Sequence, residues 1–132
     1  MNIIVCLDKN GGMLFNRRRQ SRDEKVFEDI KGYCENLYAN AFSEKLLRSY
    51  NVSFTLDNAM LDRAGSGEWC FVEDLSLAPY AKRIERVVIY RWNRIYPKDF
   101  SFDLSLDGYT SVSVTEFAGK SHETITKEIY ER

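Results

Sequence analysis

Ile3-Ile4-Val5-Cys6-Leu7 is an unbroken apolar run near the start of the chain, and Asp8-Lys9-Asn10-Gly11-Gly12 ends it with polar residues and glycines. A short run rich in β-branched residues and bounded by a turn signal is typical of a strand buried on both faces. Such strands occur in parallel sheets that helices cover. We therefore expect Ile3–Leu7 to be a buried strand of an α/β protein, followed by a loop at Asp8–Gly12.

The segments downstream alternate between strand and helix patterns. A capping box formed by Ser21 and Glu24 predicts that an amphipathic helix begins there, and Asn40 and Asp57 are predicted caps of two further helices. The remaining predicted elements are a helix at Leu75–Arg83 and strands at Leu37–Ala39, Val52–Leu56, Trp69–Val72 and Val87–Trp92. This alternation favours a mainly parallel sheet with helices on both faces.

The end of the chain has a different pattern. Tyr109–Phe117 and Glu123–Tyr130 are two alternating runs separated by Ala118–His122, which predicts a C-terminal antiparallel hairpin. The chain has 132 residues, of which 44% are hydrophobic, and shows no repeat or linker. We expect one domain over residues 1–132.

The composition argues against several classes of protein. The 19 basic and 20 acidic residues give a net charge of −1, which argues against a nucleic-acid partner. Cys6, Cys34 and Cys70 are too widely spaced for a disulfide framework or a metal-binding pair, and they suit a reducing compartment. No segment approaches the ~18 apolar residues of a membrane-spanning helix, and the first apolar run is too short for a signal peptide. We expect a cytoplasmic protein without a membrane segment.

Several segments resemble the dihydrofolate reductases in order and spacing. Asp8–Met13 stands where that family has its flexible loop, and Asp23 with Phe27 resembles the acidic and aromatic residues of its first helix. The later matching segments are Trp69–Val72, Ile84–Tyr90 and the hairpin. The resemblance implies a reductase-like fold in which Asp23 lies in a ligand cleft with Tyr90 nearby.

The chain departs from that family where the cofactor would bind. Glu73-Asp74 stands in place of consecutive glycines, and negative side chains repel a pyrophosphate. Asn40-Ala41-Phe42-Ser43 replaces a Gly-Arg-x-Thr segment, and a strand with its phosphate-holding turn is missing between Leu47 and Val52. No Gly-rich dinucleotide loop is present. We expect that the NADPH site is lost and that no cofactor is bound.

A second resemblance spans the whole chain. It is to a group of short Firmicutes proteins often labelled ribonuclease Z, with which the chain shares Gly11–Asn16, Arg18–Asp23, Cys70–Asp74, Arg91–Pro97 and Ser121–Glu131. The zinc-dependent enzyme of that name needs a cluster of histidines, whereas this chain has one histidine. We therefore predict no metal site.

The densest polar stretch, Asn16–Asp23, precedes the start of a predicted helix, where backbone amides attract anions. Its arginines can clamp a phosphate or carboxylate, and its amide side chains can bind a heterocycle edge. A solvated basic surface is the alternative interpretation. Trp92 and Asn93 follow a strand at its carboxyl end, the edge where open α/β sheets bind ligands. The predicted ligand-binding residues are Asn16, Arg18, Arg19, Gln20, Asp23, Asn40, Tyr90, Trp92 and Asn93.

Asp23 and His122 are the candidates for catalysis. A carboxyl in a cleft beneath apolar side chains has a raised pKa and can act as an acid, although an acid favoured by the helix dipole is the alternative for Asp23. His122 lies between Ser121 and Glu123, but successive residues of an extended segment point to opposite faces and do not form a triad. A turn histidine without a catalytic role is the alternative for His122.

Three functions follow from these residues. The first is binding of a polar or anionic small molecule near Asp23, on a reductase-like fold without an NADPH site. The second is a metal-independent hydrolase or ribonuclease that uses Asp23 or His122 as acid or base. The third is an interaction module or homo-oligomer, for which the aromatic residues are permissive. Whether the protein is an enzyme stays open between them.

Overall fold

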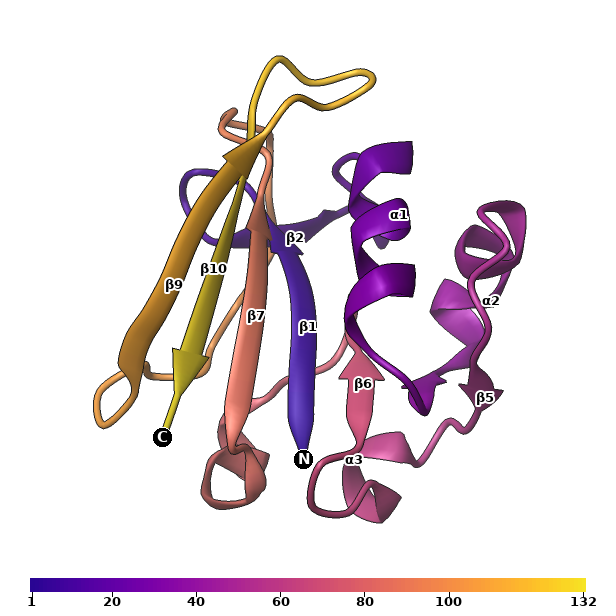
Figure 1. Cartoon of the computed structure of the whole chain (residues 1–132), viewed down its shortest axis with the longest axis vertical. Helices are drawn as coiled ribbons and strands as arrows, with labels where there is room; N and C mark the ends of the chain where they lie inside the picture. The colour runs from indigo at the N-terminus through magenta and orange to yellow at the C-terminus, as the bar shows by residue number, and fades with distance from the viewer.

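A seven-stranded sheet and a three-stranded sheet form the framework of the computed structural model, which describes residues 1–132 (Figure 1). The strand order of the large sheet is β5-β4-β6-β1-β7-β10-β9. Its strands are β1 (Asn2–Leu7), β4 (Leu37–Ala39), β5 (Thr55–Leu56), β6 (Trp69–Phe71), β7 (Arg86–Arg91), β9 (Thr110–Phe117) and β10 (Ile125–Glu131).

The predicted strand β1 lies at the centre of the large sheet, and Ile3 pairs with Cys70 of β6 on one side and Val87 of β7 on the other. Across the sheet, the five neighbouring strands β5, β4, β6, β1 and β7 are all parallel, whereas β10 is antiparallel to both β7 and β9. The mainly parallel sheet with a C-terminal antiparallel hairpin is therefore confirmed. In Figure 1, β1, β6 and β7 all point toward the top, so their carboxyl ends face the same way.

Helices cover both faces of the large sheet, as predicted. Side chains alternate along a strand, so Ile3 and Val5 enter one buried cluster while Ile4 enters the other. The Ile4 cluster includes side chains of α1 (Glu24–Tyr33) and α2 (Ala41–Ser49). The opposite cluster includes side chains of α3 (Met60–Arg63) and of the residues flanking the 3-10 helix Ala78–Arg83. None of these helices is both long and apolar enough to cross a membrane.

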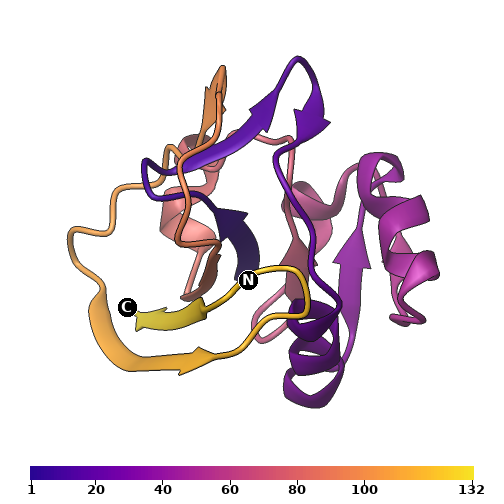
Figure 2. The same ribbon diagram turned by 90° about the horizontal axis from the view of Figure 1, so that it is seen from above.

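A second sheet, which the sequence did not predict, lies near the upper end of the large sheet in Figure 1 and to one side of its strands in the view from above (Figure 2). It consists of β2 (Gly12–Phe15), β3 (Arg18–Arg19) and β8 (Phe100–Ser101), in the order β3-β2-β8. Asn16 and Arg17 join β2 to β3 with φ angles of 52° and 61°. Two successive residues at positive φ make the tight turn whose twist suits a two-residue hairpin. This hairpin carries the polar stretch over the end of the large sheet.

Four local predictions need correction. Ala59, not Asp57, is the N-cap residue of α3, and no side chain caps that helix. Helix α1 begins at Glu24, and Asp23, not Ser21, is its N-cap, because the Asp23 Oδ1 atom accepts a hydrogen bond from the Lys25 amide at 2.9 Å. The predicted helix Leu75–Arg83 is a 3-10 helix over Ala78–Arg83. The predicted strand Val52–Leu56 is reduced to Thr55–Leu56.

Candidate functional site

The crevice between the carboxyl ends of β1 and β6 is the switch point of the large sheet. The chain leaves β1 toward helix α1 on one face, and it leaves β6 toward the 3-10 helix on the opposite face. Ligands of open α/β sheets bind at such a point, where the two connections diverge. Asp8 follows β1 and Glu73 follows β6 shortly after its end, so two carboxylates flank this crevice.

Asp8 is fully buried and is satisfied by the chain itself. Its carboxylate accepts hydrogen bonds from the amides of Asn10 and Gly12, both at 2.8 Å, and from the Tyr96 amide at 3.1 Å. The Gln20 side-chain amide donates a further bond at 3.2 Å. Burial alone would raise the pKa of Asp8, but these hydrogen bonds favour the charged form and lower the pKa below its usual value.

Glu73 is held in the same manner on the other side of the crevice. Its two oxygens accept hydrogen bonds from the Arg19 guanidinium at 2.8 and 3.0 Å, and Ser43 Oγ donates to one of them at 2.7 Å. The hydrogen bond to Glu73 raises the pKa of Arg19. Asn40 stands at the N-cap position of α2, but its Nδ2 atom donates to Asp74 at 2.9 Å and makes no cap bond. Residues of the β2–β3 hairpin and of α2 therefore occupy the crevice.

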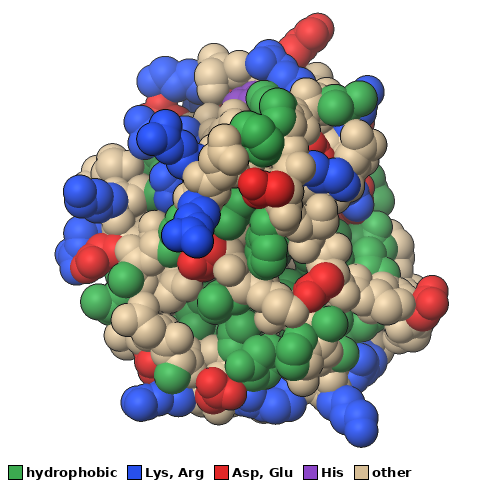
Figure 3. Space-filling view, turned by 180° about the vertical axis from the view of Figure 1, so that it is seen from behind, with side chains coloured by type: hydrophobic (Ala, Val, Ile, Leu, Met, Phe, Trp, Pro, Cys, Tyr) green, Lys and Arg blue, Asp and Glu red, His purple; other side chains and the backbone are tan.

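A pocket of about 500 Å³ opens beside this crevice. We call it the arginine pocket, and it is lined by Phe15, Asn16, Arg18, Arg19, Gln20, Tyr96 and Pro97. Four of these residues were predicted from the sequence as ligand-binding. Its lining contains two arginines and no acidic residue, and Arg19 is the only one of the two that joins an ion pair. In the view from behind, several Lys and Arg side chains lie together at the upper left of the molecule, and others lie along its lower edge (Figure 3).

Asp23, His122 and Ser21 form a hydrogen-bonded chain at the edge of this pocket. Asp23 Oδ2 lies 2.9 Å from His122 Nδ1, and His122 Nε2 lies 2.8 Å from Ser21 Oγ. The hydroxyl of Tyr96, which lines the arginine pocket, lies 3.3 Å from the same Nε2 atom. Asp23 and His122 are both buried, and the imidazole stacks on Trp92 at 4.7 Å between ring centroids. The two predicted catalytic residues thus contact each other, although they are far apart in sequence.

The expectation of a raised Asp23 pKa is wrong. Burial by itself would raise the pKa, but hydrogen bonds from the His122 side chain and from the amides of Lys120, Lys25 and Ser121 outweigh it and lower the pKa. Asp23 therefore remains a carboxylate at neutral pH and does not serve as a proton donor.

The other predicted residues have structural partners. Tyr90 is fully buried, its hydroxyl donates to Asp29 at 2.5 Å, and it does not line the arginine pocket. Asn93 adopts a positive φ of 59°, and its side chain donates to the Thr124 carbonyl and to Thr126 Oγ1. These bonds fix the segment after β7 against the start of β10.

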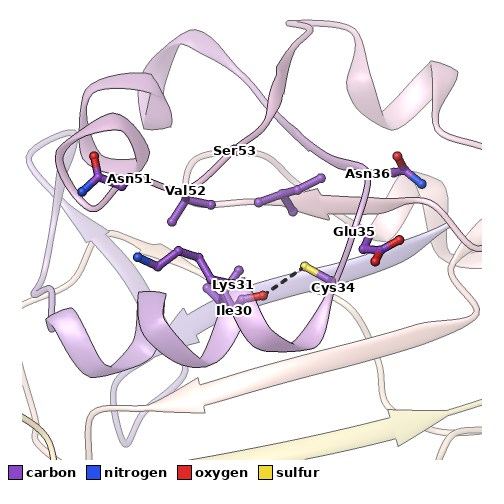
Figure 4. A pocket seen from close by; sticks show the side chains of 9 residues that line it. Ile30, Lys31, Cys34, Glu35, Asn36, Asn51, Val52 and Ser53 are labelled. Carbon is purple, nitrogen blue, oxygen red and sulfur yellow. Dashed lines mark hydrogen bonds between the residues drawn. The ribbon is translucent and has the colours of Figure 1, made fainter.

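A second pocket lies at the opposite ends of the strands (Figure 4). It is lined by residues from the end of α1, the start of β4 and the segment after α2, among them Lys31, Glu35 and Asn51. Lys31 Nζ donates to the Tyr50 carbonyl at 3.0 Å, and Cys34 Sγ donates to the Ile30 carbonyl. None of the predicted site residues lies there. The arginine pocket is therefore the candidate site.

Sequence reasoning missed Ser21 and Tyr96 as partners of His122. Ser21 was assigned to a helix cap, and Tyr96 lay within the shared segment Arg91–Pro97 without a role of its own. Their approach to His122 spans 101 and 26 positions of sequence, which no local pattern encodes. The dense polar stretch was the one signal that pointed toward Ser21.

Comparison with solved structures supports the fold. The dihydrofolate reductase from Enterococcus faecalis complexed with NADP(H) and RAB-propyl superposes with a TM-score of 0.69 and 9% sequence identity, over 99% of this chain and 95% of that chain. No protein-family model matches the sequence. No curated protein sequence matches it either. The chain thus has the dihydrofolate reductase fold, at a sequence identity that establishes the fold alone.

Proposed function

We propose that this protein binds a small molecule carrying a carboxylate or phosphate group in the arginine pocket. The observation that carries the proposal is the pocket lining, which presents Arg18 without an ion-pair partner and has no acidic residue. A guanidinium binds carboxylate and phosphate through paired hydrogen bonds. The volume of about 500 Å³ is that of a small-molecule site.

Two buried amide oxygens lack a hydrogen-bond partner at predicted ligand-binding residues, and as acceptors they suit a donor group of the ligand rather than its anionic group. Gln20 Oε1 and Asn40 Oδ1 are buried and have no hydrogen-bond partner. Such groups are rare in folded proteins because desolvation without a partner is costly. Both belong to predicted ligand-binding residues beside the crevice. The unfavourable desolvation of these two oxygens is consistent with a region shaped for binding rather than for stability alone.

NADP(H), which the similar reductase structure holds, does not fit this crevice. Glu73 is buried after β6, and Arg19 and Ser43 hold its carboxylate there. A pyrophosphate at this edge would meet the charges of Glu73 and Asp74 instead of free backbone amides. We infer that the protein has the reductase fold without its nicotinamide site.

Thermal-shift measurements with inorganic phosphate, succinate, glutarate and NADPH test both parts of the proposal. We expect phosphate or a dicarboxylate to raise the melting temperature by several degrees, and NADPH to leave it unchanged. Arg18→Gln removes the shift, whereas Arg17→Gln keeps it, because the exposed Arg17 is the neighbouring arginine that does not line the pocket. Stabilisation by NADPH would refute the loss of the nucleotide site. Failure of every anion would refute the arginine pocket as a binding site.

A further inference from the structure

The Ser21–His122–Asp23 arrangement has the connectivity of an acyl-transfer triad. His122 Nδ1 faces Asp23 Oδ2 at 2.9 Å, and His122 Nε2 faces Ser21 Oγ at 2.8 Å. A triad is recognised by this order of contacts and not by sequence position. Ser121 and Glu123, which flank His122 in sequence, do not take the nucleophile's place at Nε2.

The contacts fix the tautomer of His122. Asp23 is a carboxylate whose Oδ2 atom also accepts bonds from the Ser121 and His122 amides, at 2.8 and 3.2 Å. A carboxylate only accepts, so Nδ1 must carry the proton that it donates. Nε2 of the neutral ring is then an acceptor, and the Ser21 hydroxyl donates to it. This is the state in which an imidazole can remove the proton of a serine.

The surroundings hold the imidazole and leave the serine reachable. The His122 side chain is 2% exposed, and it is fixed by the Trp92 ring and by Asp23. Ser21 is only half-buried and belongs to no helix or strand. The amides of Ser21 and Arg22 form no hydrogen bond within the chain, which leaves both donors unpaired.

We propose that Ser21 is the nucleophile of a serine esterase, with His122 as general base and Asp23 as the residue that positions His122. Preference for an ester that carries a second, anionic group rests on the proposed function of the arginine pocket, since Tyr96 lines that pocket and contacts His122 Nε2. The assignment of the nucleophile does not depend on that preference.

The reaction has two half-steps. Ser21 Oγ forms a bond to the ester carbonyl carbon while its proton passes to His122 Nε2. The bond from that carbon to the leaving oxygen breaks, and His122 gives its proton to this oxygen, which releases the alcohol. Water then attacks the acyl-serine and gives a proton to His122. The acid leaves, and the proton returns to Ser21 Oγ.

Labelling of the purified full-length protein with a fluorophosphonate tests the nucleophile directly. We expect a single adduct that peptide mapping places on Ser21. Ser21→Ala abolishes it, whereas Ser53→Ala retains it, because Ser53 is an exposed serine distant in sequence from the triad. His122→Gln lowers the labelling rate by at least 100-fold. Circular dichroism is used to check that each variant is folded. If His122→Gln does not fold, the loss of the adduct in folded Ser21→Ala still tests the nucleophile.

Hydrolysis assays test the substrate class and the role of Asp23. Mono(4-nitrophenyl) succinate should exceed 4-nitrophenyl acetate in kcat/KM by about tenfold, a preference that Arg18→Gln removes. Asp23→Asn, once circular dichroism shows that it is folded under the assay conditions, should lower kcat and the labelling rate while phosphate binding to the arginine pocket persists.

The outcomes separate the two proposals. An adduct on Tyr96 or elsewhere, no adduct, or an adduct on Ser21 that forms equally fast in folded His122→Gln overturns the esterase. Phosphate binding without labelling leaves the proposed function standing and the esterase refuted. Labelling of Ser21 without preference for the anionic ester supports the nucleophile and refutes the anionic substrate class.

Discussion

Replacing Asp23 with asparagine should be among the most destabilising changes of one polar side chain in this protein. Asp23 Oδ1 accepts from the Lys25 and Lys120 amides at 2.9 and 3.0 Å. Oδ2 accepts from the Ser121 and His122 amides and from His122 Nδ1. One carboxylate therefore joins the start of α1 to the loop between β9 and β10.

Asparagine offers one acceptor and one donor group in place of two acceptors. In either orientation of the amide, its NH₂ group faces two backbone N–H groups of these partners and leaves them unpaired. Each unpaired buried donor costs about 1–3 kcal/mol. We expect Asp23→Asn to lower the free energy of unfolding by about 3–5 kcal/mol at pH 7, the range for breaking one side of a buried charged contact.

The effect should depend on pH in a defined direction. The folded-state pKa of Asp23 is lowered, so its contribution to stability is complete above the unfolded value of about 3.9 and declines as the pH falls below it. Urea unfolding of the wild type and of Asp23→Asn should thus differ most near neutral pH, and the difference should shrink progressively as the pH falls below about 4 toward the lowered folded-state pKa. Asp107→Asn, at an exposed turn residue, is the control and should change stability by less than about 0.5 kcal/mol. A loss below about 1 kcal/mol at pH 7, or a difference that stays constant down to pH 3, would refute this reasoning.

Three further changes test other contacts. Gly119→Ala should destabilise the protein by about 1–3 kcal/mol in thermal unfolding, because a Cβ would lie 2.6 Å from the His122 carbonyl oxygen and 2.7 Å from Asp23 Oδ2. Unchanged stability would argue against this close approach. Gly108→Ala is the comparison, at a glycine that has open space around it but a positive φ. Glu73→Gln should lower the free energy of unfolding by about 2 kcal/mol, since it weakens the paired contact with Arg19. In a double-mutant cycle with Arg19→Gln, the double variant should lose no more stability than Glu73→Gln alone, because the two side chains stabilise the protein through one shared contact. Tyr90→Phe should cost about 1 kcal/mol through the lost bond to Asp29 and leave phosphate binding intact, whereas loss of binding would restore Tyr90 to the site.

The pattern of Ile3–Leu7 was sufficient to predict a buried strand, because a strand buried on both faces needs apolar side chains in both directions. Its place at the centre of the sheet came from the structure. Alternation along Tyr109–Phe117 and Glu123–Tyr130 likewise predicted the terminal hairpin, which the pairing of β9 with β10 confirms. The second sheet escaped prediction because β3 and β8 are two residues long, too short for a period to show.

For the polar stretch Asn16–Asp23, the sequence showed which residue types are present but not which residues they contact. Asn16, Arg18, Arg19 and Gln20 do line one pocket, as side chains of neighbouring residues on a hairpin can. Whether an arginine is free or paired depends on what lies across the crevice, and Glu73 reaches Arg19 from 54 positions away. The sequence alone therefore could not distinguish Arg18 from Arg19.

Sequence by itself determined which segments are buried strands and amphipathic helices, because period and turn chemistry act over a few neighbouring residues. Only the tertiary structure decided that Asp23 meets His122 and that His122 meets Ser21. Those contacts join the start of α1 to the β9–β10 loop, 99 and 101 positions apart, and they form when the parallel strands bring their carboxyl ends to one edge. The same contacts lower the pKa of Asp23, reversing the expectation drawn from burial alone, since hydrogen bonds from distant residues outweigh desolvation.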